Sequence, residues 1–158
     1  MLIELLGTME SSSLATALRA SRIAYPVVNA LHILAIGTLF GAILSLNLRL
    51  LGAAKSIPVQ PLALYLPQVA GTGLAIAVLT GLLLFSVQPS DYVSNRAFLL
   101  KVALIAVGAL HALVVHSSGS WRRLVNDQGP ISGRLQASAA LSLTIWTAAI
   151  FSGRFIAF

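Results

Sequence analysis

The most constraining feature of this chain is the spacing of its charged residues. Asp, Glu, Lys and Arg are absent from four long stretches, which run between Arg22 and Arg49, Lys55 and Asp91, Lys101 and Arg122, and Arg134 and Arg154. A helix needs about 20 mainly apolar residues to cross a bilayer, and each stretch is near or above that length. Lipid admits only helices or closed barrels, and no stretch alternates as a barrel strand does. We therefore expect four membrane-spanning helices, at about 23–51, 62–88, 96–118 and 135–157.

The composition excludes several classes of protein. Hydrophobic residues make up 58% of the chain and charged residues 9%, with a mean hydropathy of +0.92, whereas a soluble domain is about a quarter charged. The absence of cysteine excludes disulfide scaffolds, Cys-ligated zinc, Fe–S clusters and thiol catalysis. The net charge of +6 comes without a basic face interleaved with aromatic residues. We therefore expect the lipid bilayer, and no nucleic acid, as a partner.

The connections between the expected spans are short, which favours an all-α, up-down-up-down four-helix bundle over residues 23–158. Pro58 and Pro61 are expected to break the chain between the first two spans. Residues 1–22 differ, because apolar residues recur there with helical spacing among charged and hydroxyl side chains. A signal peptide would begin with positive charge, whereas this segment begins with Glu4. It predicts an interfacial amphipathic helix.

The basic residues do not decide the orientation in the membrane. The side with both termini holds five, and so does the opposite side, so the positive-inside rule favours neither orientation. Three acidic residues lie on the terminal side, which leads us to predict termini outside. The two basic sets are Arg19, Arg22, Arg96, Lys101 and Arg154, and Arg49, Lys55, Arg122, Arg123 and Arg134.

Three histidines are the ionisable residues within the expected spans, and such residues are functional candidates because they are costly to bury. His32 lies about 13 Å past Ile23 and His111 about 15 Å past Lys101, at 1.5 Å per residue. Spans one and three run in the same direction, so we expect these two imidazoles at matching depth. His116 lies about 7.5 Å deeper than His111 and is rotated by roughly 140° on the helix.

Two histidines facing each other across a bundle are the usual arrangement for haem b, so haem b is the expected cofactor. His32 and His111 would bind the iron, and Asn29 would orient the second ring nitrogen of His32. Gly108, one turn before His111, would leave room for the porphyrin edge. Basic residues at the nearer interface, Arg19, Arg22, Arg96 or Lys101, could meet the propionates.

Other interpretations stay open. The histidines could simply hydrogen-bond to neighbouring Ser, Thr or backbone groups. A transition-metal site, above all a copper site, could use His32, His111 and His116, although Cu(I) prefers sulfur ligands and the only methionines are Met1 and Met9. No expected span holds a carboxylate, so neither a Ser–His–Asp triad nor a carboxylate pair can form there, and we expect no catalytic activity of the chain's own.

Small residues lie at close spacing on the first span. Gly37 and Gly41 form a GxxxG pattern, which permits close approach of two helices. We expect packing within the chain rather than dimerisation, and a homo-oligomer stays open.

Five short segments occur in an order that resembles a family of small bacterial four-span membrane proteins of unknown function. They are Ala24–Val28 ahead of His32, Leu48–Gly52, Thr80–Phe85, Phe98–Lys101 and Gly153–Ala157. The resemblance covers nearly all of the chain after about residue 11. The family is loosely similar to CopD-type copper-resistance proteins and to b-type cytochrome bundles, and the resemblance implies a multi-pass protein of the bacterial inner membrane.

Two positions depart from the pattern of that family. It has an acidic residue where Asn47 stands and an amide where His111 stands, so its shared histidines match His32 and His116. Two functional hypotheses follow. The first is a haem-b-binding electron-transfer or redox-anchor subunit with a redox partner or larger membrane complex. The second is a non-enzymatic membrane protein that handles copper or another ligand, or scaffolds a partner complex.

Overall fold

The computed structural model describes residues 2–126 and 129–156, and within them the only regular structure is helical. The predicted all-α fold is therefore confirmed. Each of the four predicted spans is a helix long and apolar enough to cross a membrane, and its ends lie within three residues of the expected ones. These helices are α3 (Ala24–Leu50), α4 (Val59–Val87), α6 (Arg96–Ser117) and α8 (Gly133–Phe155). Residue 157, the expected end of the fourth span, lies outside the described residues.

The outer surface of the four long helices is apolar. Leu34, Leu79 and Leu113 are each at least 64% exposed, and many other large aliphatic side chains on these helices are exposed as well. A water-soluble monomer rarely carries apolar patches of this extent, but hydrocarbon chains solvate them well. Together with the helix lengths, this surface indicates a multi-pass membrane protein.

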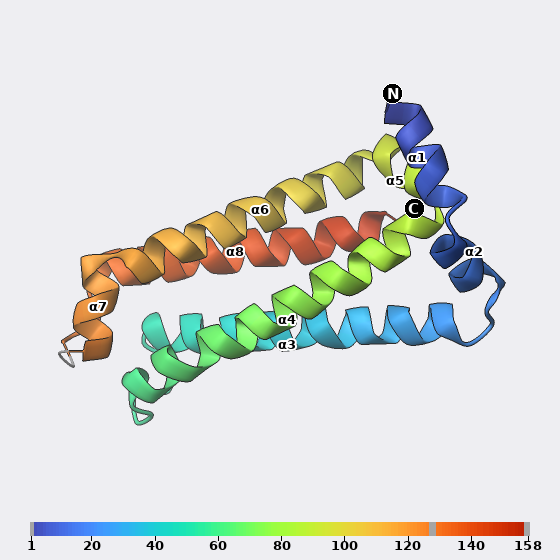
Figure 1. Cartoon of the computed structure of the whole chain (residues 1–158). Coiled ribbons are helices and arrows are strands. Elements are labelled where there is room, and N and C mark those ends of the chain that lie inside the picture. Colours follow the sequence, from blue (N-terminus) through green and yellow to red (C-terminus); the bar gives the residue numbers. More distant parts are fainter. Residues whose placement is uncertain (1, 127–128, 157–158) are drawn as a thin grey trace.

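The four long helices form two hairpins, α3 with α4 and α6 with α8, which meet where α3 packs against α8 (Figure 1). Within the first hairpin the backbones touch at Gly73, where a Cβ atom would lie 2.8 Å from the amide nitrogen of Leu39. Gly37 and Gly41 are instead exposed, with nothing within 4 Å of the corresponding Cβ positions. The expectation that this GxxxG pair packs within the chain was wrong, because α4 and α8 contact other faces of α3.

Two short helices complete the connections and were not predicted. They are α5 (Pro89–Ser94) and α7 (Gly119–Asn126). In α7, Trp121 and Leu124 are buried, and the Gln60 side chain of α4 donates a hydrogen bond to the carbonyl of Val125. Pro61 does not separate the first two spans as expected, since it lies in the first turn of α4, where a helix needs no amide donor.

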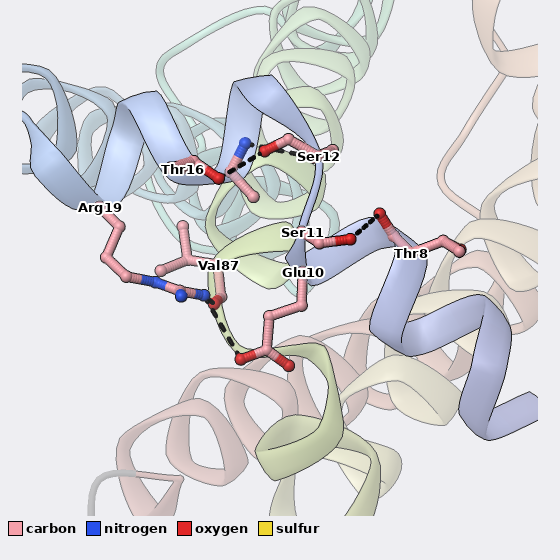
Figure 2. Close-up of polar contacts among 8 residues, drawn as sticks. Thr8, Glu10, Ser11, Ser12, Thr16, Arg19 and Val87 are labelled. Atoms are coloured by element: carbon pink, nitrogen blue, oxygen red, sulfur yellow. Dashed lines mark hydrogen bonds and ion pairs between the residues drawn. The ribbon is translucent and has the colours of Figure 1, made fainter.

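The N-terminal segment forms two helices, α1 (Leu2–Glu10) and α2 (Ser13–Ala20), rather than one over 1–22. The break has a local cause, because the Ser12 side chain accepts a hydrogen bond from the amide of Ala15 and so begins a new helix. Arg19 then fastens the segment to the bundle (Figure 2). Its guanidinium donates to the carbonyl of Val87 at the end of α4 and lies 3.4 Å from a carboxylate oxygen of Glu10.

Candidate intramembrane ligand cleft

Each of the three contacts between long helices contains one hydrogen bond between side chains. The pairs are His32 with Thr80 at 2.9 Å between α3 and α4, His111 with Ser138 at 3.0 Å between α6 and α8, and Asn47 with Ser142 at 3.0 Å between α3 and α8. Two of the three candidate histidines therefore have a hydroxyl partner on a neighbouring helix. Hydrogen bonding to a neighbouring Ser or Thr is one of the interpretations that the sequence left open for these histidines.

The ring of His32 is held on two sides. The Thr80 hydroxyl lies 2.7 Å from the carbonyl of Ile76, to which it donates its single hydrogen, so it accepts from Nδ1 of His32. The ring lies against Gly81, where a Cβ atom would be 3.1 Å from Cε1. Thr80 therefore orients the His32 ring through Nδ1. Asn29, which the sequence predicted for this orienting role, is exposed instead.

His32 and His111 do not face each other. His32 lies 15 residues before Asn47 on α3, or about 22 Å along the helix axis. Asn47 bonds to Ser142 of α8, and His111 bonds to Ser138, one turn away on the same helix. His111 therefore lies near the level of Asn47 and far from that of His32. The depth match expected from the sequence is absent.

His116, at the end of α6, has a different environment. Its Nδ1 lies 2.6 Å from the carbonyl of Ala112, and because a carbonyl only accepts, Nδ1 carries the hydrogen. In the neutral imidazole, Nε2 then keeps a lone pair. Nε2 is buried and has no hydrogen-bond partner, alone among buried side-chain nitrogen and oxygen atoms of the described residues. The ring packs against Trp121, with centroids 4.3 Å apart and an interplanar angle of 67°.

His111 and His116 both line a cleft of about 380 Å³ that is bounded by all four long helices and α7. The cleft lies in the half of the bundle away from the termini. Its lining is mostly aliphatic, and Asn47, Ser138 and Ser142 add polar groups. Both tryptophans of the chain, Trp121 and Trp146, also line it. The volume is within the range of small-molecule sites, at its lower end.

The separation of α4 and α6 indicates where the cleft opens. At the terminal end of the bundle, the rings of Phe85 on α4 and Phe98 on α6 stack with centroids 5.5 Å apart. Throughout the described residues, however, the Cα atoms of α4 and α6 stay more than 8 Å apart. Because α3 packs against α8 on the opposite side of the bundle, we infer that the cleft opens between α4 and α6. In a membrane-spanning bundle, such an opening faces the hydrocarbon phase.

The cleft carries no formal charge, since none of its described lining residues is Asp, Glu, Lys or Arg. The described residues also contain no group of three or more His, Cys, Asp or Glu side chains placed to share a metal ion. The chemistry available in the cleft is therefore that of neutral hydrogen bonds, two indole rings and the imidazoles of His111 and His116, of which Nε2 of His116 is buried without a partner.

Gly108 does not leave space for a cofactor edge. It is buried under Trp146, and a Cβ atom there would lie 2.9 Å from Cε2 and Cζ2 of the indole. Sequence reasoning also missed the two tryptophans as cleft residues. The sequence did contain a signal for the polar wall of the cleft. Ser138 and Ser142 are four residues apart and therefore share one helix face.

Comparison with known proteins finds no family model, no curated protein and no solved structure that matches this chain. The resemblance to small bacterial four-span membrane proteins stays a prediction.

Proposed function

We propose that this protein is a non-enzymatic integral membrane protein that binds a small lipid-soluble ligand in the cleft between its two hairpins. The observation that carries the proposal is the buried, unpartnered Nε2 of His116 in a residue that lines the cleft. An unsatisfied buried polar atom costs about 1–3 kcal/mol. A ligand that supplies a hydrogen-bond donor or a metal centre to this nitrogen recovers that cost.

The test compares two glycine variants with the unmodified protein. Gly71 lines the cleft on α4, Gly37 lies on the lipid face of α3, and a Cβ atom at either position meets nothing within 4 Å. Gly71→Leu narrows the mouth of the cleft, whereas Gly37→Leu adds the same side chain elsewhere. Each protein is purified without delipidation, and bound small molecules are extracted and identified by mass spectrometry. We expect one compound that is lost in Gly71→Leu alone. The same content in all three proteins overturns the proposal.

Haem b is a second candidate ligand, and the protein would then be a redox subunit. The favouring observation is again His116, because histidines that bind metals usually donate the other ring N–H to a carbonyl or carboxylate, as Nδ1 does to Ala112. The iron ligand in this proposal is His116 instead of a His32–His111 pair. We expect a reduced-minus-oxidised b-type spectrum that is lost in His116→Ala and kept in His32→Ala. A colourless protein from haem-replete cells excludes this candidate.

We also propose that the protein lies in the inner membrane of a bacterium with both termini outside. The family resemblance and the acidic residues near the termini support this. The chain has no cysteine, so single cysteines at exposed positions report orientation cleanly. Ser90, at the terminal end, and Ser56, at the opposite end, are both exposed. A membrane-impermeant thiol reagent should label Ser90→Cys in intact cells but not Ser56→Cys, and the reverse result overturns the orientation.

A further inference from the structure

The unpartnered Nε2 of His116 requires a ligand that donates a hydrogen bond. Nδ1 is committed as a donor to the carbonyl of Ala112, so Nε2 of the neutral ring can only accept. A group that only accepts, such as a ketone, ester or ether oxygen, therefore gains nothing from this nitrogen. A hydroxyl or N–H group does.

The lining of the cleft restricts the charge of the ligand. Among its described residues there is no charged side chain, and the opening leads to hydrocarbon. A charge carried into such a site without a partner is strongly unfavourable. The ligand is therefore neutral when bound.

The shape of the site favours a flat ring. The cleft holds about 380 Å³, and the indoles of Trp121 and Trp146 both line it. Indole rings interact favourably with the face or edge of another aromatic ring. Trp121 also packs directly on the His116 ring, with an interplanar angle of 67°.

Resting on the proposed function, we infer that the ligand is a neutral, lipid-soluble aromatic ring that carries a hydroxyl group, of the hydroquinone class. Its hydroxyl group donates a hydrogen bond to Nε2 of His116. The ring occupies the cleft beside the two indoles, and apolar substituents extend through the mouth between α4 and α6. The inference concerns binding alone and involves no transfer of electrons.

The test uses two probes, tetramethylhydroquinone and its dimethyl ether, in which a methyl group replaces each hydroxyl hydrogen. Trp121 and Trp146 are the only tryptophans in the chain, so intrinsic tryptophan emission of the purified full-length protein in detergent micelles reports directly on the cleft. Titrations are run under anaerobic conditions to keep the hydroquinone reduced. We expect the hydroquinone to bind about tenfold more tightly than the ether. His116→Ala removes this preference, and His32→Ala keeps it.

The outcomes separate the inference from the proposed function. Equal affinities for the two probes overturn the hydroxyl requirement, and so does an unchanged preference in His116→Ala. If neither probe changes the emission, the aromatic class is wrong. In each of these cases the proposed function is judged separately, by whether a co-purified compound is lost in Gly71→Leu and kept in Gly37→Leu.

Discussion

The contact between α3 and α4 leads to a quantitative prediction at Gly73. A Cβ atom at this position would lie 2.8 Å from the amide nitrogen of Leu39 and 3.0 Å from the carbonyl oxygen of Ala35. Both are backbone atoms, so Gly73→Ala forces the two helices apart instead of rotating a side chain. Gly71 lies two residues away on the same helix, and a Cβ atom there meets nothing within 4 Å.

The pair of variants isolates the cost of that contact. Gly→Ala within a helix raises helix stability by about 0.5–1 kcal/mol, and this gain is common to Gly71→Ala and Gly73→Ala. Overpacking a close contact costs about 1–3 kcal/mol. The free energy of unfolding of Gly73→Ala should therefore lie below that of Gly71→Ala by about 1–3 kcal/mol, which is roughly a 5-fold to 150-fold change in the unfolding equilibrium.

Reversible unfolding in mixed micelles, with increasing mole fraction of a denaturing detergent and circular dichroism as the readout, measures this difference. The unmodified protein is expected to lie about 0.5–1 kcal/mol below Gly71→Ala and at or above Gly73→Ala. Equal stabilities for Gly71→Ala and Gly73→Ala would show that the backbones of α3 and α4 do not touch at Gly73, and would refute the packing of the first hairpin.

Three further predictions concern other contacts. A double-mutant cycle of Asn47→Ala and Ser142→Ala should give a coupling of about 0.6 kcal/mol, and at most about 1.7, as is typical of polar pairs between membrane helices; a coupling of zero would contradict the bond between α3 and α8. Gly108→Ala should displace the indole of Trp146 and shift the tryptophan emission, which an unchanged spectrum would rule out. Burial raises the pKa of the Tyr92 hydroxyl, so the neutral form is favoured in the folded protein and stability falls as the pH rises through that raised pKa. In Tyr92→Phe, an alkaline titration of tyrosinate absorbance should lose the step that lies above the ordinary tyrosine range, and an unaltered titration would contradict the burial.

The spans could be predicted from the sequence because one physical requirement, the exclusion of charge from hydrocarbon, fixes both their number and their ends. The short helix α7 gave no such signal. It has only eight residues, and two of its apolar side chains, Trp121 and Leu124, are buried by contacts with residues of other helices. The division of the N-terminal segment depends on a local cap at Ser12, which competes with continuation of a single helix.

The relation between the histidines could not be predicted for a different reason. Depth was counted from Lys101 as though it marked the membrane boundary, but Lys101 lies five residues inside α6, with its ammonium along Gly153. Long basic side chains extend toward the interface from within a span. Which histidine remains without a partner depends on the rotation of each helix, and hydropathy alone does not encode that rotation. For this reason the sequence favoured His32 and His111 as the ligand pair, although His116 is the histidine with a buried, unpartnered nitrogen.

The three side-chain pairs between the long helices also act against sliding. Apolar surfaces in lipid slip past one another at little cost, because hydrocarbon replaces each lost contact. A shift of one helical turn, about 5.4 Å, would instead separate His32 from Thr80, His111 from Ser138 or Asn47 from Ser142 and leave both members facing hydrocarbon. With one such pair at each of the three contacts, the bundle has a single axial alignment. The heights of the cleft walls relative to one another are thereby fixed.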